Sequence, residues 1–214
     1  MIKWQASWSS GLLYRRCNYL MDKIQSPGDG HRMGPIRPNQ RTVHSSWDLI
    51  VTFEGLVFGK QKRKESISFF AWLLLQCKIL TADKLLARRW PCSPSCTLCT
   101  QEPETAPHLI LHCAFARQVW AKLETWSQNL ITIPAQGIDI MEWWEKELAN
   151  LPKKIRRLKA TLLIYGAWNI WKARNKWVFE HQILTPTEVL QEIKAELNCR
   201  VLACGKPELS LFNV

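Results

Sequence analysis

The chain has 214 residues, 47% of them hydrophobic, and its 29 Lys and Arg against 18 Asp and Glu give a net charge of +11. This length and hydrophobic content suffice for one domain with a buried core and appended segments. No apolar run approaches the roughly 18 residues of a membrane span, and the first residues lack the apolar core of a signal peptide. We therefore expect an intracellular protein, nuclear or cytoplasmic, whose cysteines serve as thiols or metal ligands rather than in disulfides.

Residues 1–65 carry the weakest structural signals. Gly and Pro punctuate the stretch 26–46, which also contains Ser, Asn, Arg and His. This composition is typical of irregular chain. We treat residues 1–65 as a partly irregular N-terminal segment.

The pattern becomes helical from residue 66. Apolar residues crowd the stretch 67–75 too densely for one exposed face, so we expect this helix to be central in the fold. Thr81 is suited to cap a short helix that ends before Trp90 and Pro91. After Cys113, apolar residues at steps of 3 or 4 from Phe115 to Trp126 predict one buried stripe.

Three more helices are predicted downstream. The residues from Asp139 to Glu142 form a capping box, which marks a helix start. Apolar residues recur every 3 or 4 positions through 155–171 and predict a long amphipathic helix. Thr185 and Glu188 frame a second capping box with proline at the first helical position. The predicted fold class is mainly α.

One segment carries a pattern of metal ligands. Cys96 and Cys99 are separated by two residues, and His108, His112 and Cys113 follow. Thiolate sulfur and imidazole nitrogen bind Zn²⁺ in closed four-coordinate sites, and a Cys-x₂-Cys turn supplies two ligands from the same side. The fourth ligand is open, because His112 shares a helical face with His108, whereas Cys113 requires the helix to break. We predict a small zinc-binding loop embedded in the helical domain.

The residues around this loop resemble the zinc-binding region at the C-terminal end of plant non-LTR (LINE-type) retrotransposon reverse transcriptases. The similar stretches are residues 69–75 and 79–85, Cys96-x₂-Cys99, His108-Leu109 and Cys113-x₆-Trp120, together with Ala167-Trp168-Asn169-Ile170-Trp171-Lys172 in the segment that follows. The resemblance implies a zinc-binding domain over 66–130 and a helical C-terminal extension over 131–214. It also implies the ligand set Cys96, Cys99, His108 and Cys113.

Four protein ligands leave no open coordination position, so we expect a structural Zn²⁺ rather than a catalytic one. Glu102 and Glu104 are then expected to be solvated residues of the ligand loop, with a cap on the short helix at 105–107 as the alternative for Glu104. Cys92 is a third possible ligand, but we expect it to be a loop thiol. The chain contains no Asp-Asp pair of the kind that holds polymerase metals and no nucleotide-binding or endonuclease motif. We therefore expect no enzymatic activity and no small-molecule substrate.

The positive net charge favours a polyanionic partner, RNA or DNA. Most of the twelve Trp residues lie on helical stripes and are expected in the core rather than as base-stacking platforms. We expect nucleic acid to contact six basic residues, namely Lys153, Lys154, Arg156, Arg157, Lys172 and Arg174. Residues 60–64 form a second basic cluster. The sequence thus indicates a noncatalytic zinc-binding module that contacts nucleic acid. A structural or protein-interaction helical domain, or an inactive transposon remnant, is the alternative.

Overall fold

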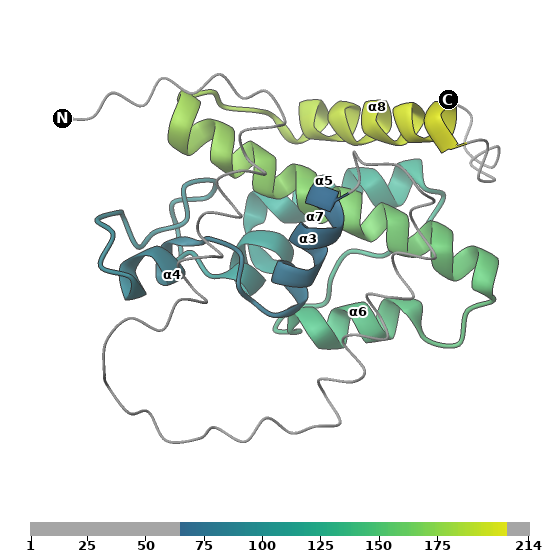
Figure 1. Cartoon of the computed structure of the whole chain (residues 1–214), viewed down its shortest axis with the longest axis horizontal. Coiled ribbons are helices and arrows are strands. Elements are labelled where there is room, and N and C mark those ends of the chain that lie inside the picture. The colour runs from purple at the N-terminus through teal and green to yellow at the C-terminus, as the bar shows by residue number, and fades with distance from the viewer. Residues whose placement is uncertain (1–64, 205–214) are drawn as a thin grey trace. The chain divides into compact units, whose positions relative to one another are not determined.

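The computed structural model describes residues 65–204, with side chains over 67–199 (Figure 1). These residues form α3 (Glu65–Leu75), α4 (Ala82–Ala87), a short π-helix η2 (His108–His112), α5 (Ala114–Trp126), α6 (Ile140–Leu148), α7 (Lys153–Glu180) and α8 (Pro186–Cys204). No β-strand occurs within 65–204, so the mainly α fold is confirmed. None of the helices in this part of the chain is both long and apolar enough for a membrane span.

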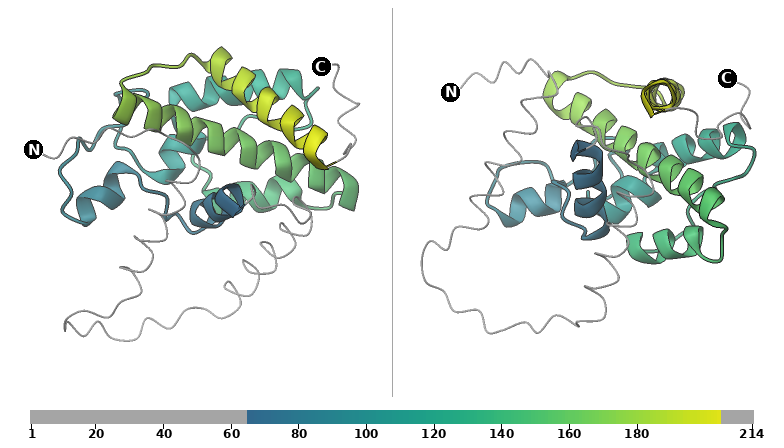
Figure 2. Two further views of the ribbon diagram at one scale, coloured as in Figure 1. Left: turned by 45° about the horizontal axis from the view of Figure 1, so that its top comes forward. Right: turned by 45° about the vertical axis from the view of Figure 1, so that its right-hand side comes forward.

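The long helix α7 organises the described residues. It packs against α3, α5, α6, α8 and η2, and Figure 2 shows it running between α8 (yellow) and α3 (dark blue). The helix is present as predicted, but every residue from 160 to 167 is buried, so this part of α7 is enclosed by its neighbours and is not amphipathic. We expected the helix at 66–75 to be the central one, but α3 packs mainly against α7 and α6.

A close approach between α5 and α7 fixes the middle of the core. Trp120 of α5 is fully buried, its ring packs edge-on against Trp143 at 5.5 Å, and its Nε1 donates to the Ile110 carbonyl at 2.7 Å. A Cβ atom on Gly166 of α7 would lie 2.6 Å from the Trp120 ring. Glycine at this position lets the two helices enclose the indole.

The other tryptophans expected in the core pack at its edge. Trp126, Trp168 and Trp171 are half-buried and lie against the buried cluster. The rings of Trp168 and Trp171 stack at 5.3 Å, and Phe70 of α3 lies 5.2 Å from the first of them. These aromatic contacts join α3 to α7. Trp72 is also half-buried and stacks on Phe69.

The capping box at Thr185 is complete, because the Thr185 amide donates to the Glu188 carboxylate at 2.7 Å and the Glu188 amide donates to the Thr185 hydroxyl oxygen at 3.3 Å. At Asp139 the carboxylate accepts from the Glu142 amide at 2.7 Å, which is the N-cap half of the predicted box. Thr81 stands at the N-cap of α4 as expected, but its side chain makes no cap hydrogen bond. The carboxylate of Glu104, in the predicted metal-binding loop, accepts a hydrogen bond from the first amide of α4 instead.

Candidate metal centre

A tight loop brings Cys96 and Cys99 together. The Cys96 amide donates to the Glu102 carbonyl and the Thr100 amide to the Cys96 carbonyl, both at 2.8 Å, while Thr100 takes a left-handed φ of 59°. The amides of Leu98 and Cys99 donate to the Cys96 sulfur. Amides that point at a sulfur favour its thiolate, the form that binds metal, but in Cys96 the hydrogen bond with Cys113 and burial outweigh them and raise its pKa.

The π-helix η2 places His108 beside Cys113. The Cys113 amide donates to the His108 carbonyl at 2.6 Å, five residues back. This wider turn brings position 113 over position 108, which an α-helical turn would not do. Cys113 itself leaves the helix, with ψ at 133°, and stands at the N-cap of α5. The break that a Cys113 ligand requires is therefore present.

The four side chains meet within the dimensions of a tetrahedral metal site. The sulfurs of Cys96 and Cys113 are 3.8 Å apart, the Cys99 sulfur lies 3.3 Å from His108 Nε2, and all four ligand atoms lie within 4.8 Å of one another. Tetrahedral Zn²⁺ with bonds of about 2.3 Å to sulfur and 2.0–2.1 Å to nitrogen sets these separations at about 3.8 Å and 3.6 Å. The donor set and its spacing fit zinc.

The buried sulfurs of Cys96 and Cys113 are joined by a hydrogen bond that shifts their pKa values in opposite directions. The hydrogen bond from Cys96 lowers the pKa of the Cys113 thiol against the effect of burial, aided by the amides of Ala116 and Phe115 at the start of α5. The same hydrogen bond, together with burial, raises the pKa of Cys96. The amides at the start of α5 therefore favour the thiolate form of Cys113, which is the form that binds metal.

A carboxylate orients the histidine. Glu102 Oε2 lies 3.0 Å from His108 Nδ1, which leaves Nε2 directed at Cys99. Metal-binding histidines commonly hold such a partner on their second nitrogen. The Glu102 side chain is 65% exposed, so it is solvated as we expected.

The expectation for Glu104 was wrong. Its side chain is fully buried, its Oε1 lies 2.7 Å from Arg174 Nη2, and its Oε2 accepts from Arg174 Nε at 3.2 Å. The same Oε1 accepts the Ala82 amide at 2.8 Å, the first amide of α4. One carboxylate therefore joins the ligand loop to α4 and α7.

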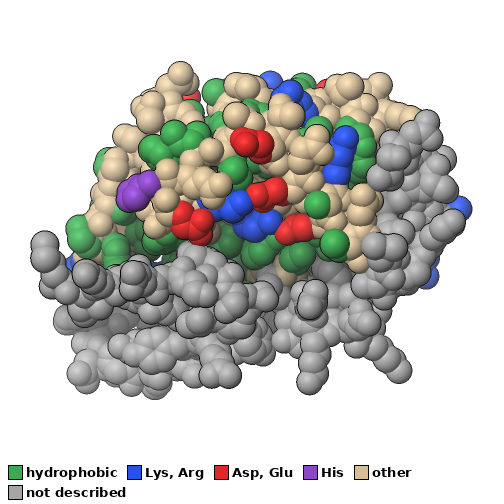
Figure 3. Space-filling view, turned by 90° about the horizontal axis from the view of Figure 1, so that it is seen from above, with side chains coloured by type: hydrophobic (Ala, Val, Ile, Leu, Met, Phe, Trp, Pro, Cys, Tyr) green, Lys and Arg blue, Asp and Glu red, His purple; other side chains and the backbone are tan. Residues whose placement is uncertain are grey.

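This pair also corrects the interpretation of Arg174, which we had assigned to nucleic-acid contact. The side chain is 5% exposed and is occupied by Glu104 and Asn175. Lys172 is likewise engaged, with its Nζ 2.6 Å from Glu196 and 3.5 Å from Glu192. Figure 3 shows acidic and basic side chains side by side on the face seen from above. This face is mixed in charge rather than basic.

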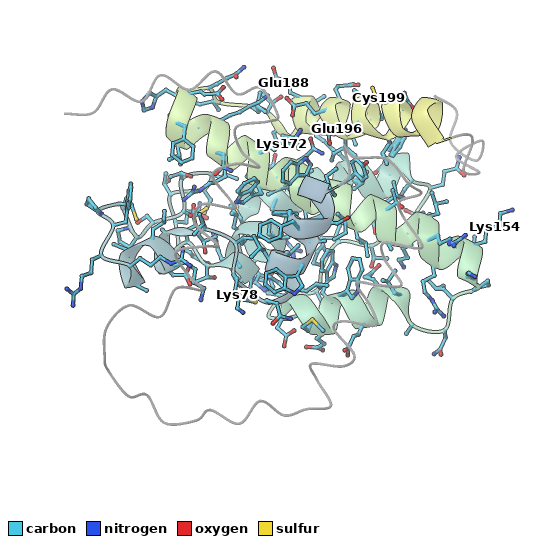
Figure 4. The ribbon with its side chains drawn as sticks, viewed as in Figure 1. Lys78, Lys154, Lys172, Glu188, Glu196 and Cys199 are labelled. Atoms are coloured by element: carbon cyan, nitrogen blue, oxygen red, sulfur yellow. The ribbon has the colours of Figure 1, made fainter. Side chains whose placement is uncertain are left out.

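The remaining predicted contact residues lie at the start of α7. Lys153, Lys154, Arg156 and Arg157 are all exposed. In Figure 4, Lys154 points away from the helices, whereas Lys172 and Glu196 face each other between α7 and α8. The second basic cluster, residues 60–64, lies outside the described residues.

The alternative ligands lie away from the cluster. His112 Nε2 is 2.9 Å from the Ile138 carbonyl oxygen, and the Cys92 sulfur is 3.8 Å from the Ala82 carbonyl oxygen. Neither belongs to the group of atoms that converge around Cys96. Sequence reasoning missed the π-turn and the buried Arg174, because neither leaves a local pattern.

The fold and the cluster define a helical domain with a Cys₃His site for a metal ion. Residues 42–120 match the model of a family described as zinc-binding in reverse transcriptase, and the match includes all four clustered side chains. The match begins upstream of residue 66, in the segment that our sequence analysis set apart. That family is described by metal binding and not by catalysis. No curated protein and no solved structure matches the chain.

Proposed function

We propose that the chain is a noncatalytic zinc-binding module derived from a plant non-LTR (LINE-type) retrotransposon reverse transcriptase, and that it contacts RNA or DNA through a basic surface. The convergence of Cys96, Cys99, His108 and Cys113, inside a region similar to a reverse transcriptase zinc-binding family, carries this proposal. The metal is structural, because four protein ligands leave no position for water or substrate.

The start of α7 supports the nucleic-acid contact. Its first turns carry four exposed cations and no acidic residue in the first turn. Cations at a helix N-terminus oppose the helix dipole, whereas a phosphate there is favoured by both the dipole and the cations. We assign phosphate binding to Lys153, Lys154, Arg156 and Arg157. We no longer assign nucleic-acid contact to Lys172 and Arg174.

Metal analysis of the purified protein tests the first half of the proposal. The parent protein should contain about one zinc per chain, and Cys99→Ser should lose it. Cys92→Ser is the matched control, because this cysteine belongs to the same stretch but not to the cluster. Equal zinc content in both variants would contradict the ligand assignment.

A salt titration tests the second half. Binding to RNA and to duplex DNA should weaken linearly with log salt, and exchanging the four cations of α7 for glutamine should flatten the slope by about 0.7–0.9 for each phosphate that the variant no longer neutralises. Lys172→Gln should leave the slope unchanged, because this lysine is ion-paired with Glu196.

A protein-interaction domain is the second candidate function. Leu86, Trp90, Phe179 and Ile183 are large apolar side chains that stay exposed. Absence of binding to either polymer at low salt would reject the nucleic-acid contact and favour this candidate.

A further inference from the structure

The end of α4 carries an exposed aromatic residue that directly follows two exposed arginines. Trp90 is 59% exposed, although most described tryptophans pack on or within the core. Arg88 and Arg89 precede it and are exposed as well. We call residues 88–90 the α4 tip.

The backbone holds the α4 tip in a fixed conformation. The Trp90 amide donates to the Leu85 carbonyl at 3.0 Å and the Arg89 amide to the Leu86 carbonyl at 2.8 Å. This pair of hydrogen bonds is a Schellman motif, in which the residue at the position of Arg89 is left-handed and usually glycine. Arg89 takes a φ of 59° there. A long cationic side chain thus stands where glycine would fold with less strain, and such strain points to a function of the side chain.

The α4 tip is tied to the metal centre. The first amide of α4 is held by Glu104, and the Glu104 amide donates to the Pro94 carbonyl at 2.8 Å. Pro91 follows Trp90 and restricts the chain further. The backbone that carries the Trp90 ring is therefore held in one conformation before a ligand binds. Less conformational entropy of the protein is then lost on binding.

The charge around the α4 tip suits a polyanion. No Asp or Glu occurs between Lys84 and Gln101. Within the part of the chain that the structure describes, neither Arg88 nor Arg89 forms an ion pair, in contrast to Arg174. Arginine guanidinium groups bind phosphate in a bidentate manner.

We propose that the α4 tip binds single-stranded nucleic acid, with the Trp90 ring stacked on one base and the two arginines on flanking phosphates. The inference rests on the proposed nucleic-acid function and names a site and a ligand form for it. A duplex hides its base faces, whereas a single strand can offer one to an exposed ring. The flanking cations favour a polyanion over an apolar protein surface as the occupant.

The test compares three probes: an oligo(dT), an abasic oligonucleotide of the same length, and a DNA duplex. Trp90→Ala should weaken oligo(dT) binding by about 5- to 150-fold, the range expected for the removal of one stacked base. It should change binding to the abasic strand and the duplex by less than about 2-fold, because these two probes are held through their phosphates. Trp90→Phe should restore most of the affinity, and Ile183→Ala, which removes an apolar side chain exposed by 71%, should have no effect.

Arg89→Gly separates binding from folding. Glycine suits the left-handed position, so the melting temperature should stay unchanged or rise, while affinity for both single strands should fall. Oligo(dT) binding that Trp90→Ala leaves unchanged would overturn the inference and leave the proposed nucleic-acid function standing. Failure of the parent protein to bind all three probes at low salt would overturn both.

Discussion

The ligand loop, residues 91–105, and the helical bundle that packs around α7 are stabilised in different ways. Between residues 91 and 105 the buried side chains are those of Cys96 and Glu104, a predicted metal ligand and an ion-paired carboxylate. In α7, by contrast, every residue from 160 to 167 is buried and nearly all are apolar. Apolar burial scales with area and tolerates change, whereas a metal site and a buried ion pair depend on single atoms. We therefore expect a single substitution to disrupt the structure of the loop, whereas a single substitution in the bundle should lower its stability only in part.

Removal of zinc should have the largest effect. Structural zinc contributes about 10–16 kcal/mol of apparent binding energy in small finger peptides near neutral pH. A chelator should expose residues 90–113 to limited proteolysis, while α7 and α8 keep their helical circular dichroism. Unchanged proteolysis would mean that the loop does not depend on metal, and complete loss of helicity would mean that the bundle does.

Breaking the buried ion pair should rank second. Arg174→Met leaves the fully buried Glu104 carboxylate without its cation and should destabilise the protein by about 3–5 kcal/mol. Urea unfolding measures this change. Lys172→Met, on the same helix but in a partly exposed pair with Glu196, is the control and should cost less than about 1 kcal/mol. Equal losses of stability in the two variants would contradict the role of the Glu104–Arg174 pair in joining the loop to α7.

Overpacking the contact between α5 and α7 should lower the free energy of unfolding by less than the loss of the buried ion pair does. Gly166→Ala places a methyl group 2.6 Å from the Trp120 ring in the static structure, and the overpacking should cost about 1–3 kcal/mol. The zinc content should stay at the parent level, because the added methyl group would contact Trp120 and Leu123 and none of the four clustered side chains. A variant that loses zinc together with stability would show that loop and bundle are one cooperative unit.

Helix caps should have the smallest effects. Asp139→Ala removes the acceptor for the Glu142 amide and should cost about 1 kcal/mol in urea unfolding. Asp139 is not one of the four clustered side chains, so metal binding should not change. A measured decrease in zinc content would argue against separate stabilisation.

The second cap predicts a pH dependence. Hydrogen bonds from the Thr185 amide and hydroxyl lower the pKa of Glu188 from its ordinary value of 4.5. A lowered folded pKa contributes stability above the ordinary value, and this contribution is lost as the pH falls through the folded pKa. Glu188→Gln should therefore flatten the fall of unfolding free energy in acid. An unchanged profile would show that this cap is not occupied in solution.

Local sequence patterns were sufficient for the positions of most helices but not for every cap, because Thr81 makes no cap hydrogen bond at α4. The steps of 3 and 4 residues along α7 and the two capping boxes are set by neighbours a turn away, so the sequence displays them directly. The ligand motif is local as well, since Cys96 and Cys113 lie in one short stretch. Its geometry needed the π-turn at η2, which has no distinctive residue pattern.

Contacts between distant residues could not be predicted. Glu104 and Arg174 are 70 positions apart, and a charged residue in a loop or on a helix is exposed more often than buried. The same reasoning placed Arg174 on a binding surface. Only the packing of α7 against the loop shows that the two charges neutralise each other in the interior.

Zinc content across two variants tests the central claim most directly, because it asks whether the loop is built around the cluster that contains Cys113. Elemental analysis should find about one zinc per chain in the parent protein. Cys113→Ser should abolish tight binding, whereas His112→Ala should keep it, since His112 is occupied by the Ile138 carbonyl. Loss of zinc in His112→Ala with retention in Cys113→Ser would contradict the site described above.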